Sequence, residues 1–183
     1  MAKSIRIETN RLIIEPFTKK YLTHRYVNWL NDPEVVRYSD QRLKKHSLES
    51  CHQYMQSFEG TPNYFWALTE RDPAYGHIGN MNAYIDNKNL TADLGILIGE
   101  KNAWMKGYGT EAWLAVCNYL FDSGIKKLTA GTLPLNSAMI ALMRRVGMKE
   151  DINMTQESFF EGKRINIIKM SLYRPLSCLG FKA

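Results

Sequence analysis

Two glycines one residue apart interrupt the chain where an apolar strand pattern gives way to a helical one. They lie in the run Trp104-Met105-Lys106-Gly107-Tyr108-Gly109-Thr110. Residues without a Cβ atom let an anion approach the main chain, and the free N–H groups at a helix start carry partial positive charge. This segment therefore favours the binding of a phosphate group. The third glycine of a dinucleotide fingerprint and the Gly-Lys-Ser/Thr ending of a P-loop are missing, so a tight strand-to-helix turn remains an alternative.

Hydrophobic periodicity places this loop in a series of strands and helices. A strand broken near Asn10 is predicted over 5–17, followed by a helix over 18–30 with Thr18 as its candidate cap. The same patterns predict helices over 47–58, 107–121 and 136–146, strands over 64–69, 76–85, 90–99, 126–133 and 164–173, and an extra strand near 148–154. No repeat or long linker divides this series. It predicts one mixed α/β domain over 1–174 with a tail over 175–183.

Composition supports a globular protein. The chain has 183 residues, 45% of them hydrophobic, and its 24 basic and 18 acidic residues give a net charge of +6. No apolar run reaches the roughly 18 residues that a membrane helix needs, which predicts a protein that is neither secreted nor membrane-spanning. Cys51, Cys117 and Cys178 form no CxxC pair, which favours reduced thiols and a cytoplasmic location. The four histidines show no metal-ligand spacing, so no metal is predicted.

Three segments together resemble the GNAT superfamily of N-acetyltransferases. Gly107-Tyr108-Gly109 matches the family's Gln/Arg-x-x-Gly-x-Gly/Ala loop, although Trp104 stands at the Gln/Arg position. Leu135-Asn136-Ser137, with Gly147 and Met148 after the helix, is similar to the family's Asn-led helix that ends in Gly-Phe. The opening Glu8-Thr9-Asn10-Arg11-Leu12 resembles the branch that contains ribosomal-protein N-acetyltransferases. The resemblance covers nearly the whole chain and implies a splayed central sheet flanked by helices.

The resemblance also implies a cofactor, acetyl-CoA. Its pantetheine arm is expected in the gap beside the strand over 94–98, bonded by main-chain groups much as an added strand would be. Its pyrophosphate is expected on the N–H groups of the glycine loop, and Asn136 is expected to bond the pantetheine, although Asn136 also suits a helix N-cap. The residues expected to bind the cofactor are Leu94, Ile96, Leu97, Ile98, Lys106, Gly107, Tyr108, Gly109, Thr110 and Asn136.

Amide formation requires a neutral amine, a stabilised oxyanion and a proton for the departing thiolate. Asp93, at an acidic position common in this branch, is the candidate base, with a turn or strand-edge carboxylate as the alternative. Many relatives donate the proton from a tyrosine seven positions after the helix-opening Asn. Here that position is Met143, which fits the apolar core stripe of its helix. Tyr84, Tyr108, Ser137 or solvent remain alternative donors.

The acceptor pocket is expected to come from the first helices and the turn over 86–89. Trp29, Tyr38, Tyr64 and Trp66 either stack on a sugar or base there or belong to the core. The leading hypothesis is acetyl transfer to a small or carrier-linked amine such as an amino sugar nucleotide, ahead of a protein N-terminus. The alternatives are a catalytically silent CoA sensor and a nucleic-acid-binding domain, which the scattered basic residues disfavour. A homodimer is left open.

Overall fold

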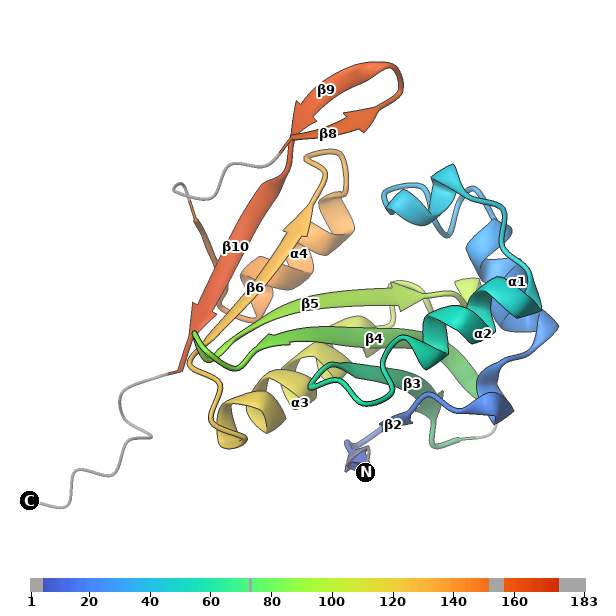
Figure 1. Ribbon diagram of the computed structural model, residues 1–183, viewed down its shortest axis with the longest axis horizontal. Helices are drawn as coiled ribbons and strands as arrows, with labels where there is room; N and C mark the ends of the chain where they lie inside the picture. Colours follow the sequence, from blue (N-terminus) through green and yellow to red (C-terminus); the bar gives the residue numbers. More distant parts are fainter. Residues whose placement is uncertain (1–4, 73, 152–156, 175–183) are drawn as a thin grey trace, which may run out of the picture.

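The computed structural model describes residues 5–72, 74–151 and 157–174 (Figure 1). In these residues one eight-stranded sheet has the order β1-β2-β3-β4-β5-β6-β10-β7, and β8 and β9 form a separate hairpin. The strands are β1 (Ile7–Glu8), β2 (Leu12–Pro16), β3 (Tyr64–Glu70), β4 (His77–Asp86), β5 (Thr91–Ile98), β6 (Lys127–Thr132), β7 (Lys149–Glu150), β8 (Glu157–Phe160), β9 (Lys163–Asn166) and β10 (Ile168–Tyr173).

Helices cover both faces of the sheet (Figure 1). Helices α3 (Tyr108–Asp122) and α4 (Ser137–Arg145) pack on one face, where Trp113, Val116 and Leu120 are fully buried. Helices α1 (His24–Asn31) and α2 (Leu48–Gln56) cover the other face with a second apolar cluster. Three short 3₁₀ turns, η1 (Lys19–Tyr21), η2 (Asp40–Leu43) and η3 (Lys101–Ala103), complete the elements. None of the described helices is long and apolar enough to span a bilayer.

The sheet opens between β5 and β6, as Figure 1 shows. These two strands are parallel, and their pairing in the described residues begins with Thr91 opposite Lys127 and ends with Asp93 opposite Thr129. Beyond that point β6 stays with β10, and β5 stays with β4 as far as Ile98. The mixed α/β fold with a splayed sheet is therefore confirmed, and the strands over 64–69, 76–85 and 90–99 form the antiparallel meander that periodicity suggests.

Two predicted elements differ from the structure. The predicted helix over 18–30 is a 3₁₀ turn followed by α1, whose cap is Thr23 and not Thr18: the Thr23 hydroxyl accepts from Tyr26 N–H. The predicted strand over 164–173 is two strands, since β9 folds back on β8 before β10 begins. Glu161 and Gly162 both have positive φ, 48° and 78°, which suits a two-residue hairpin turn. Of the strand near 148–154 only β7 is described, and the predicted tail over 175–183 lies outside the described residues.

Candidate active site

The edge of β5 that faces the gap carries free main-chain groups. Gly99 N–H donates to the Ile78 carbonyl. Because main-chain hydrogen bonds alternate along an antiparallel pair, every second residue of β5 before Gly99, such as Leu97, is hydrogen-bonded to β4. The intervening residues, Leu94 and Ile96, direct N–H and C=O away from β4, where the described part of β6 offers no pairing. This edge can accept an extended, amide-bearing ligand as an added strand. Leu97 instead presents its side chain to the α1 and α2 face.

The glycine loop joins β5 to α3 and leaves the helix start open. Gly107 is the N-cap residue with φ of 82°, and no side chain caps the helix. The first main-chain bond of α3 runs from Glu111 N–H to the Gly107 carbonyl, so the N–H groups over 108–110 have no partner within the helix. At Gly109 a Cβ atom would lie 3.2 Å from Leu142 Cδ1. The absence of side chains at both glycines therefore exposes a cradle of amides that suits a phosphate.

Arg11 and Glu111 hold the glycine loop in place through hydrogen bonds. Glu111 accepts hydrogen bonds from Arg11 N–H, from Arg11 Nε at 2.7 Å and from the Thr9 hydroxyl at 2.6 Å. Arg11 also donates to the Lys106 carbonyl at 2.8 Å, and its guanidinium lies over the Tyr108 ring. Burial alone would raise the pKa of Glu111, but these hydrogen bonds outweigh it and hold the pKa below its usual value. The opening motif of the chain thus fixes the loop's position.

Other loop side chains are turned toward structural partners. Trp104 Nε1 donates to the Ile98 carbonyl at 2.8 Å, which closes the free end of β5. Lys106 Nζ is 3.0 Å from the Tyr75 hydroxyl and lies over its ring. Tyr108 is buried, and its hydroxyl donates to Glu70 beneath the helix start, a bond that raises the pKa of Tyr108. This orientation points the Tyr108 hydroxyl away from the gap.

Asn136 occupies the N-cap of α4, beside the strand that diverges from β5. Its Oδ1 accepts from Met139 N–H at 3.1 Å, and its Nδ2 donates to the Thr132 hydroxyl at 3.0 Å. Both ends of the amide therefore have partners within the protein. The N-cap interpretation of Asn136 is confirmed, and its contact with a cofactor stays a prediction.

Asp93 lies where β5 and β6 begin to separate. Thr129 donates to Asp93 Oδ2 at 2.7 Å, and Lys169 Nζ lies 3.8 Å from the same oxygen. The Asp93 side chain is 47% exposed, so it is both oriented and open to solvent. In the strand alternation Asp93 shares the face of Gly95 and Leu97, which is the face covered by α1 and α2. The structure thus places this carboxylate at the vertex of the gap.

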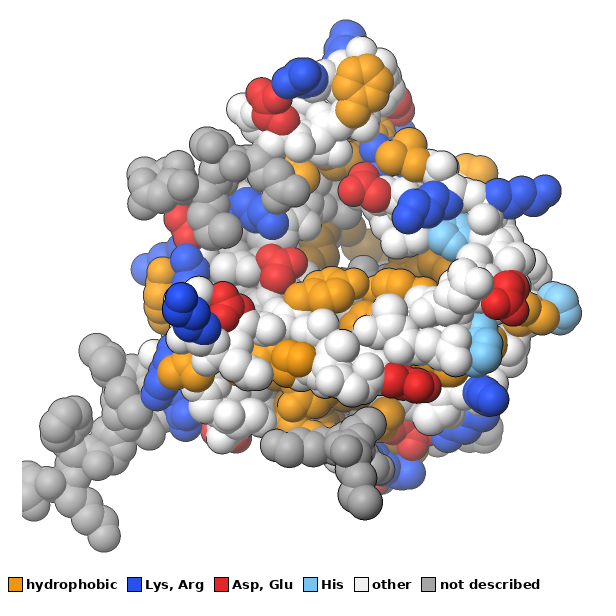
Figure 2. All heavy atoms as spheres, in the orientation of Figure 1, with side chains coloured by type: hydrophobic (Ala, Val, Ile, Leu, Met, Phe, Trp, Pro, Cys, Tyr) orange, Lys and Arg blue, Asp and Glu red, His pale blue; other side chains and the backbone are white. Residues whose placement is uncertain are grey.

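A cavity of about 490 Å³ lies on this same face, between β4, β5, α1, α2 and the turn η2. Figure 2 shows a hollow on this side of the molecule, below the β8–β9 hairpin at the top of the view. Gly95, Ile96 and Leu97 of β5 form part of the wall, so the cavity backs directly onto the strand that borders the gap. A Cβ atom at Gly95 would lie 2.3 Å from Asn82 Oδ1, so this glycine makes room for the amide.

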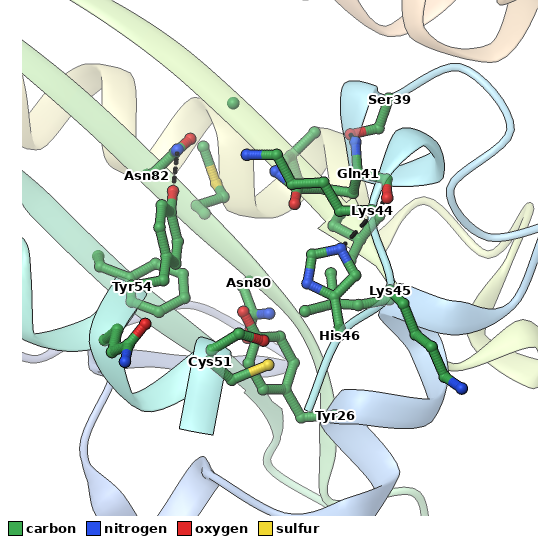
Figure 3. Close-up of a pocket in the computed structure, with 18 residues that line it drawn as sticks. Tyr26, Ser39, Gln41, Lys44, Lys45, His46, Cys51, Tyr54, Asn80 and Asn82 are labelled. Atoms are coloured by element: carbon green, nitrogen blue, oxygen red, sulfur yellow. Dashed lines mark hydrogen bonds between the residues drawn. The ribbon is translucent and has the colours of Figure 1, made fainter. Parts of the chain in front are cut away.

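Polar groups on one wall of the cavity form a short network that sequence patterns do not reveal. Asn82 Nδ2 donates to the Tyr54 hydroxyl at 3.0 Å (Figure 3), and that hydroxyl is 3.0 Å from the Tyr84 hydroxyl. Burial raises the pKa of Tyr54 well above its usual value, so it stays protonated. Tyr54 comes from α2 and Asn82 from the strand that packs under it. Their spacing in sequence gave no signal, because only the tertiary packing of α2 on β4 brings them together.

Several residues that the sequence suggested for the acceptor pocket do not line this cavity. The turn over 86–89 does not line the cavity; it joins the ends of β4 and β5 on the closed side of the gap. The proposed aromatic set does not line it either: Trp29 and Trp66 are core residues, Tyr64 stacks on Trp66, and Tyr38 stacks on Phe160 of the hairpin. The core alternative, left open from the sequence, is right for the two tryptophans.

Three other residues have structural roles, and for Met143 this is the role that the sequence favoured. Met143 is fully buried in the core. His77 Nε2 contacts the Gly79 carbonyl and Asn80 Oδ1, and burial lowers the pKa of His77 to about 4, so the ring is neutral at pH 7. Burial raises the pKa of the Cys117 thiol to about 12, which makes it a core side chain and not a nucleophile. Cys178 lies outside the described residues.

Comparison with known proteins agrees with this geometry. A family model described as an acetyltransferase (GNAT) domain matches residues 11–149. The fold is similar to a ribosomal L7/L12 alpha-N-protein acetyltransferase in complex with coenzyme A, with a TM-score of 0.81 at 12% identity, over 92% of this chain and 98% of that one. It is also similar to a spermidine N-acetyltransferase from Vibrio cholerae, in complex with CoA and spermine, with a TM-score of 0.77 at 15% identity, over 90% and 96%.

A third similar structure is the Microcin C7 self immunity acetyltransferase in complex with acetyl-CoA and AMP. Its TM-score is 0.77 at 15% identity, and the match covers 91% of this chain and 94% of that one. At these identities the solved structures show a shared fold, whereas the family model spans most of the chain. The chain belongs to the GNAT family and is an acetyl-CoA-dependent N-acetyltransferase.

Proposed function

We propose that this protein transfers an acetyl group from acetyl-CoA to the primary amine of a small or carrier-linked acceptor, such as an amino sugar nucleotide. The observation that carries the proposal is the cavity of about 490 Å³ that backs onto β5. A volume of this size is typical of a site for a small ligand. Its position lets an amine reach β5 from the face opposite α3 and α4.

The gap and the glycine cradle fit coenzyme A. Free main-chain groups of Leu94 and Ile96 would hold the amides of the pantetheine arm, and the N–H of Ile98 extends this edge. Unpartnered N–H groups at the start of α3 would hold the pyrophosphate. The residues proposed to bind the cofactor through these groups, or beside them, are Leu94, Ile96, Leu97, Ile98, Lys106, Gly107, Tyr108, Gly109, Thr110 and Asn136. Leu97 would contribute its side chain on the acceptor side.

The chain's own residues would then manage charge and protons. Acetyl-CoA supplies a thioester, which is an activated acyl group. Asp93, held by Thr129 at the vertex of the gap, would accept the proton of the acceptor ammonium, whose pKa is about 10 when it resembles lysine. A main-chain N–H of Leu94 or Ile96 would stabilise the developing oxyanion. Tyr84, 45% exposed and hydrogen-bonded to Tyr54, would be the proton donor, since Tyr108 is buried against Glu70.

A protein N-terminus is the second candidate acceptor. It is favoured by the similarity of the whole fold to an enzyme that acetylates the α-amine of a ribosomal protein. A peptide would enter the same cavity with its first residues. The two candidates predict different kinetics: a small acceptor gains nothing from peptide residues beyond the cavity, whereas a protein acceptor loses affinity when shortened to an amino acid.

Thiol release with a panel of amines tests the proposed function. The purified chain is incubated with acetyl-CoA and, separately, amino sugars, their nucleotide-linked forms, polyamines and peptides with free N-termini. Products are identified by mass spectrometry. We expect the highest kcat/KM with an amino sugar or its nucleotide-linked form. Preference for a peptide would favour the second candidate, and binding of CoA without turnover on any amine would indicate a sensor.

A further inference from the structure

Lys44 is a basic side chain in the cavity wall without an acidic partner. It follows the turn η2, and Figure 3 shows its side chain pointing into the cavity, whereas the neighbouring Lys45 points away from it. In the part of the chain that the structure describes, no carboxylate lies within 4.0 Å of Lys44 Nζ. By contrast Arg42, two residues earlier, pairs with Asp40. Lys44 therefore leaves a positive charge free to meet a ligand.

The charge of the cavity lining discriminates between possible acceptors. The lining combines an apolar floor with amide, hydroxyl and imidazole groups and the ammonium group of Lys44, and its described residues include no aspartate or glutamate. A polyamine carries several positive charges, and a site for it needs carboxylates to offset the repulsion and the loss of hydration. This cavity offers a positive charge in place of the carboxylates that a polyamine needs. The lining therefore disfavours a polycationic acceptor and favours one with a negative group.

The segment that carries Lys44 is held in place on three sides. Ser39 caps the turn η2 by accepting from Gln41 N–H, and Lys44 N–H donates to the Gln41 carbonyl. His46 Nε2 lies 3.2 Å from that same carbonyl (Figure 3). Arg42 donates to the Phe159 carbonyl at 2.9 Å, which ties the turn to the β8–β9 hairpin above the cavity. These bonds fix the backbone from which the exposed Lys44 side chain reaches into the cavity.

We propose that the acceptor is a small amine that carries a phosphate group and that Lys44 binds this phosphate. The inference rests on the proposed function and deepens it, because it assigns the acceptor's charge and the side chain that selects it. A phosphate accepts charge-assisted hydrogen bonds from an ammonium group. The Gln41 side chain, which reaches into the cavity beside Lys44, can donate to the same group (Figure 3). The amine then lies toward β5, at the opposite wall.

A matched pair of amines tests this assignment. Glucosamine and glucosamine 6-phosphate differ by one phosphate, and both are assayed for acetyl transfer and, without cofactor, for binding by calorimetry. The enzyme variants are Lys44→Gln, Lys44→Arg and, as the control, Lys45→Gln, whose side chain points away from the cavity. We expect the phosphorylated amine to have the lower KM. Lys44→Gln should raise that KM about tenfold and weaken binding equally, since one charge-assisted contact is lost.

The remaining outcomes decide the proposal. Lys44→Arg and Lys45→Gln should stay within about twofold of the parent, and added salt should reduce the preference for phosphate. Turnover that is equal on both amines and insensitive to Lys44→Gln would overturn the inference and leave the proposed function standing. Binding of glucosamine 6-phosphate that depends on Lys44, without turnover on any amine, would overturn the proposed function instead. A Lys44-dependent preference for an acidic peptide over both sugars would replace the small phosphorylated acceptor.

Discussion

Asp93 shows how the surroundings of one side chain follow from its place in the sheet. It stands at the last paired position of β5 and β6, accepts a hydrogen bond from Thr129 and keeps nearly half of its side chain exposed. A carboxylate that is oriented yet reachable can serve as a proton acceptor. The same aspartate in an ordinary strand would be only a solvated edge residue. The difference lies in the gap that opens beside it.

Asp93→Asn should lower kcat/KM by about 10²- to 10⁴-fold at neutral pH, the usual contribution of a general base. The loss should shrink as the pH approaches 10, because a rising fraction of the amine is then neutral without help. Rates measured from pH 6 to 10 check this. Asp122→Asn, at an exposed carboxylate near the end of α3, is the control and should follow the parent. A constant ratio between variant and parent across the pH range would remove Asp93 as the base.

At the scale of the element, the start of α3 suits an anion because Gly107 adopts a conformation that leaves the first amides of the helix without a side-chain cap. The left-handed φ of 82° turns the chain from the loop into the helix, and Arg11 and Glu111 hold that turn against the first strands. Gly124 follows the end of the same helix with φ of 100°, and the position that a Cβ atom would take there is open space. The two glycines therefore both adopt a positive φ, at opposite ends of the same helix.

Gly107→Ala and Gly124→Ala should each destabilise the fold by about 1 kcal/mol, since alanine is strained at positive φ. Only Gly107→Ala should also weaken the binding of CoA, by about tenfold. The backbone at residue 107 would shift to relieve the strain, and this shift would move the amides that would hold the pyrophosphate. Thermal melts report the first effect and calorimetric titration with CoA the second. An affinity for CoA that is the same in both variants would show that the start of α3 is not the phosphate site.

Across the whole molecule, His77 joins the sheet to the α1 layer. Its ring lies 4.8 Å from Tyr21 and 4.9 Å from Trp29, and it is hydrogen-bonded to Asn80 in the cavity wall. Burial is the main reason that its pKa falls from 6.5 to about 4. Between these values the unfolded chain binds a proton that the folded chain does not. The free energy of unfolding therefore decreases as the pH falls from about 6.5 to 4.

His77→Gln should remove this component of the pH dependence, which is at most about 3 kcal/mol for a shift of this size. Chemical denaturation at several pH values between 4 and 7 measures it. The parent should lose more stability toward pH 4 than the variant, whereas His24→Gln, at an exposed histidine, should keep the parent's slope. Parallel curves for the parent and His77→Gln would show that His77 is not the buried titrating group.

Local patterns in the sequence determined most of the elements. Period-two and helical spacing predicted the meander β3-β4-β5 and the helices α2, α3 and α4, because burial of one face imposes that spacing. Asn136 is a helix cap in the structure, and Met143 is core, as their local sequence indicates. The glycine loop was visible for the same reason: strand, turn and helix are consecutive in the chain, so their chemistry can be interpreted without any long-range contact.

Tertiary structure alone decided which residues meet across the sheet. The network of Asn82, Tyr54 and Tyr84, the vertex position of Asp93 and the inward direction of Lys44 depend on packing between segments that are distant in the chain. The β8–β9 hairpin over the cavity was missed, because only Ile167 separates β9 from β10, so the two read as one strand over 164–173. Side-chain spacing encodes which face of an element is buried but not which element covers it, and the cavity is formed by contacts between such elements.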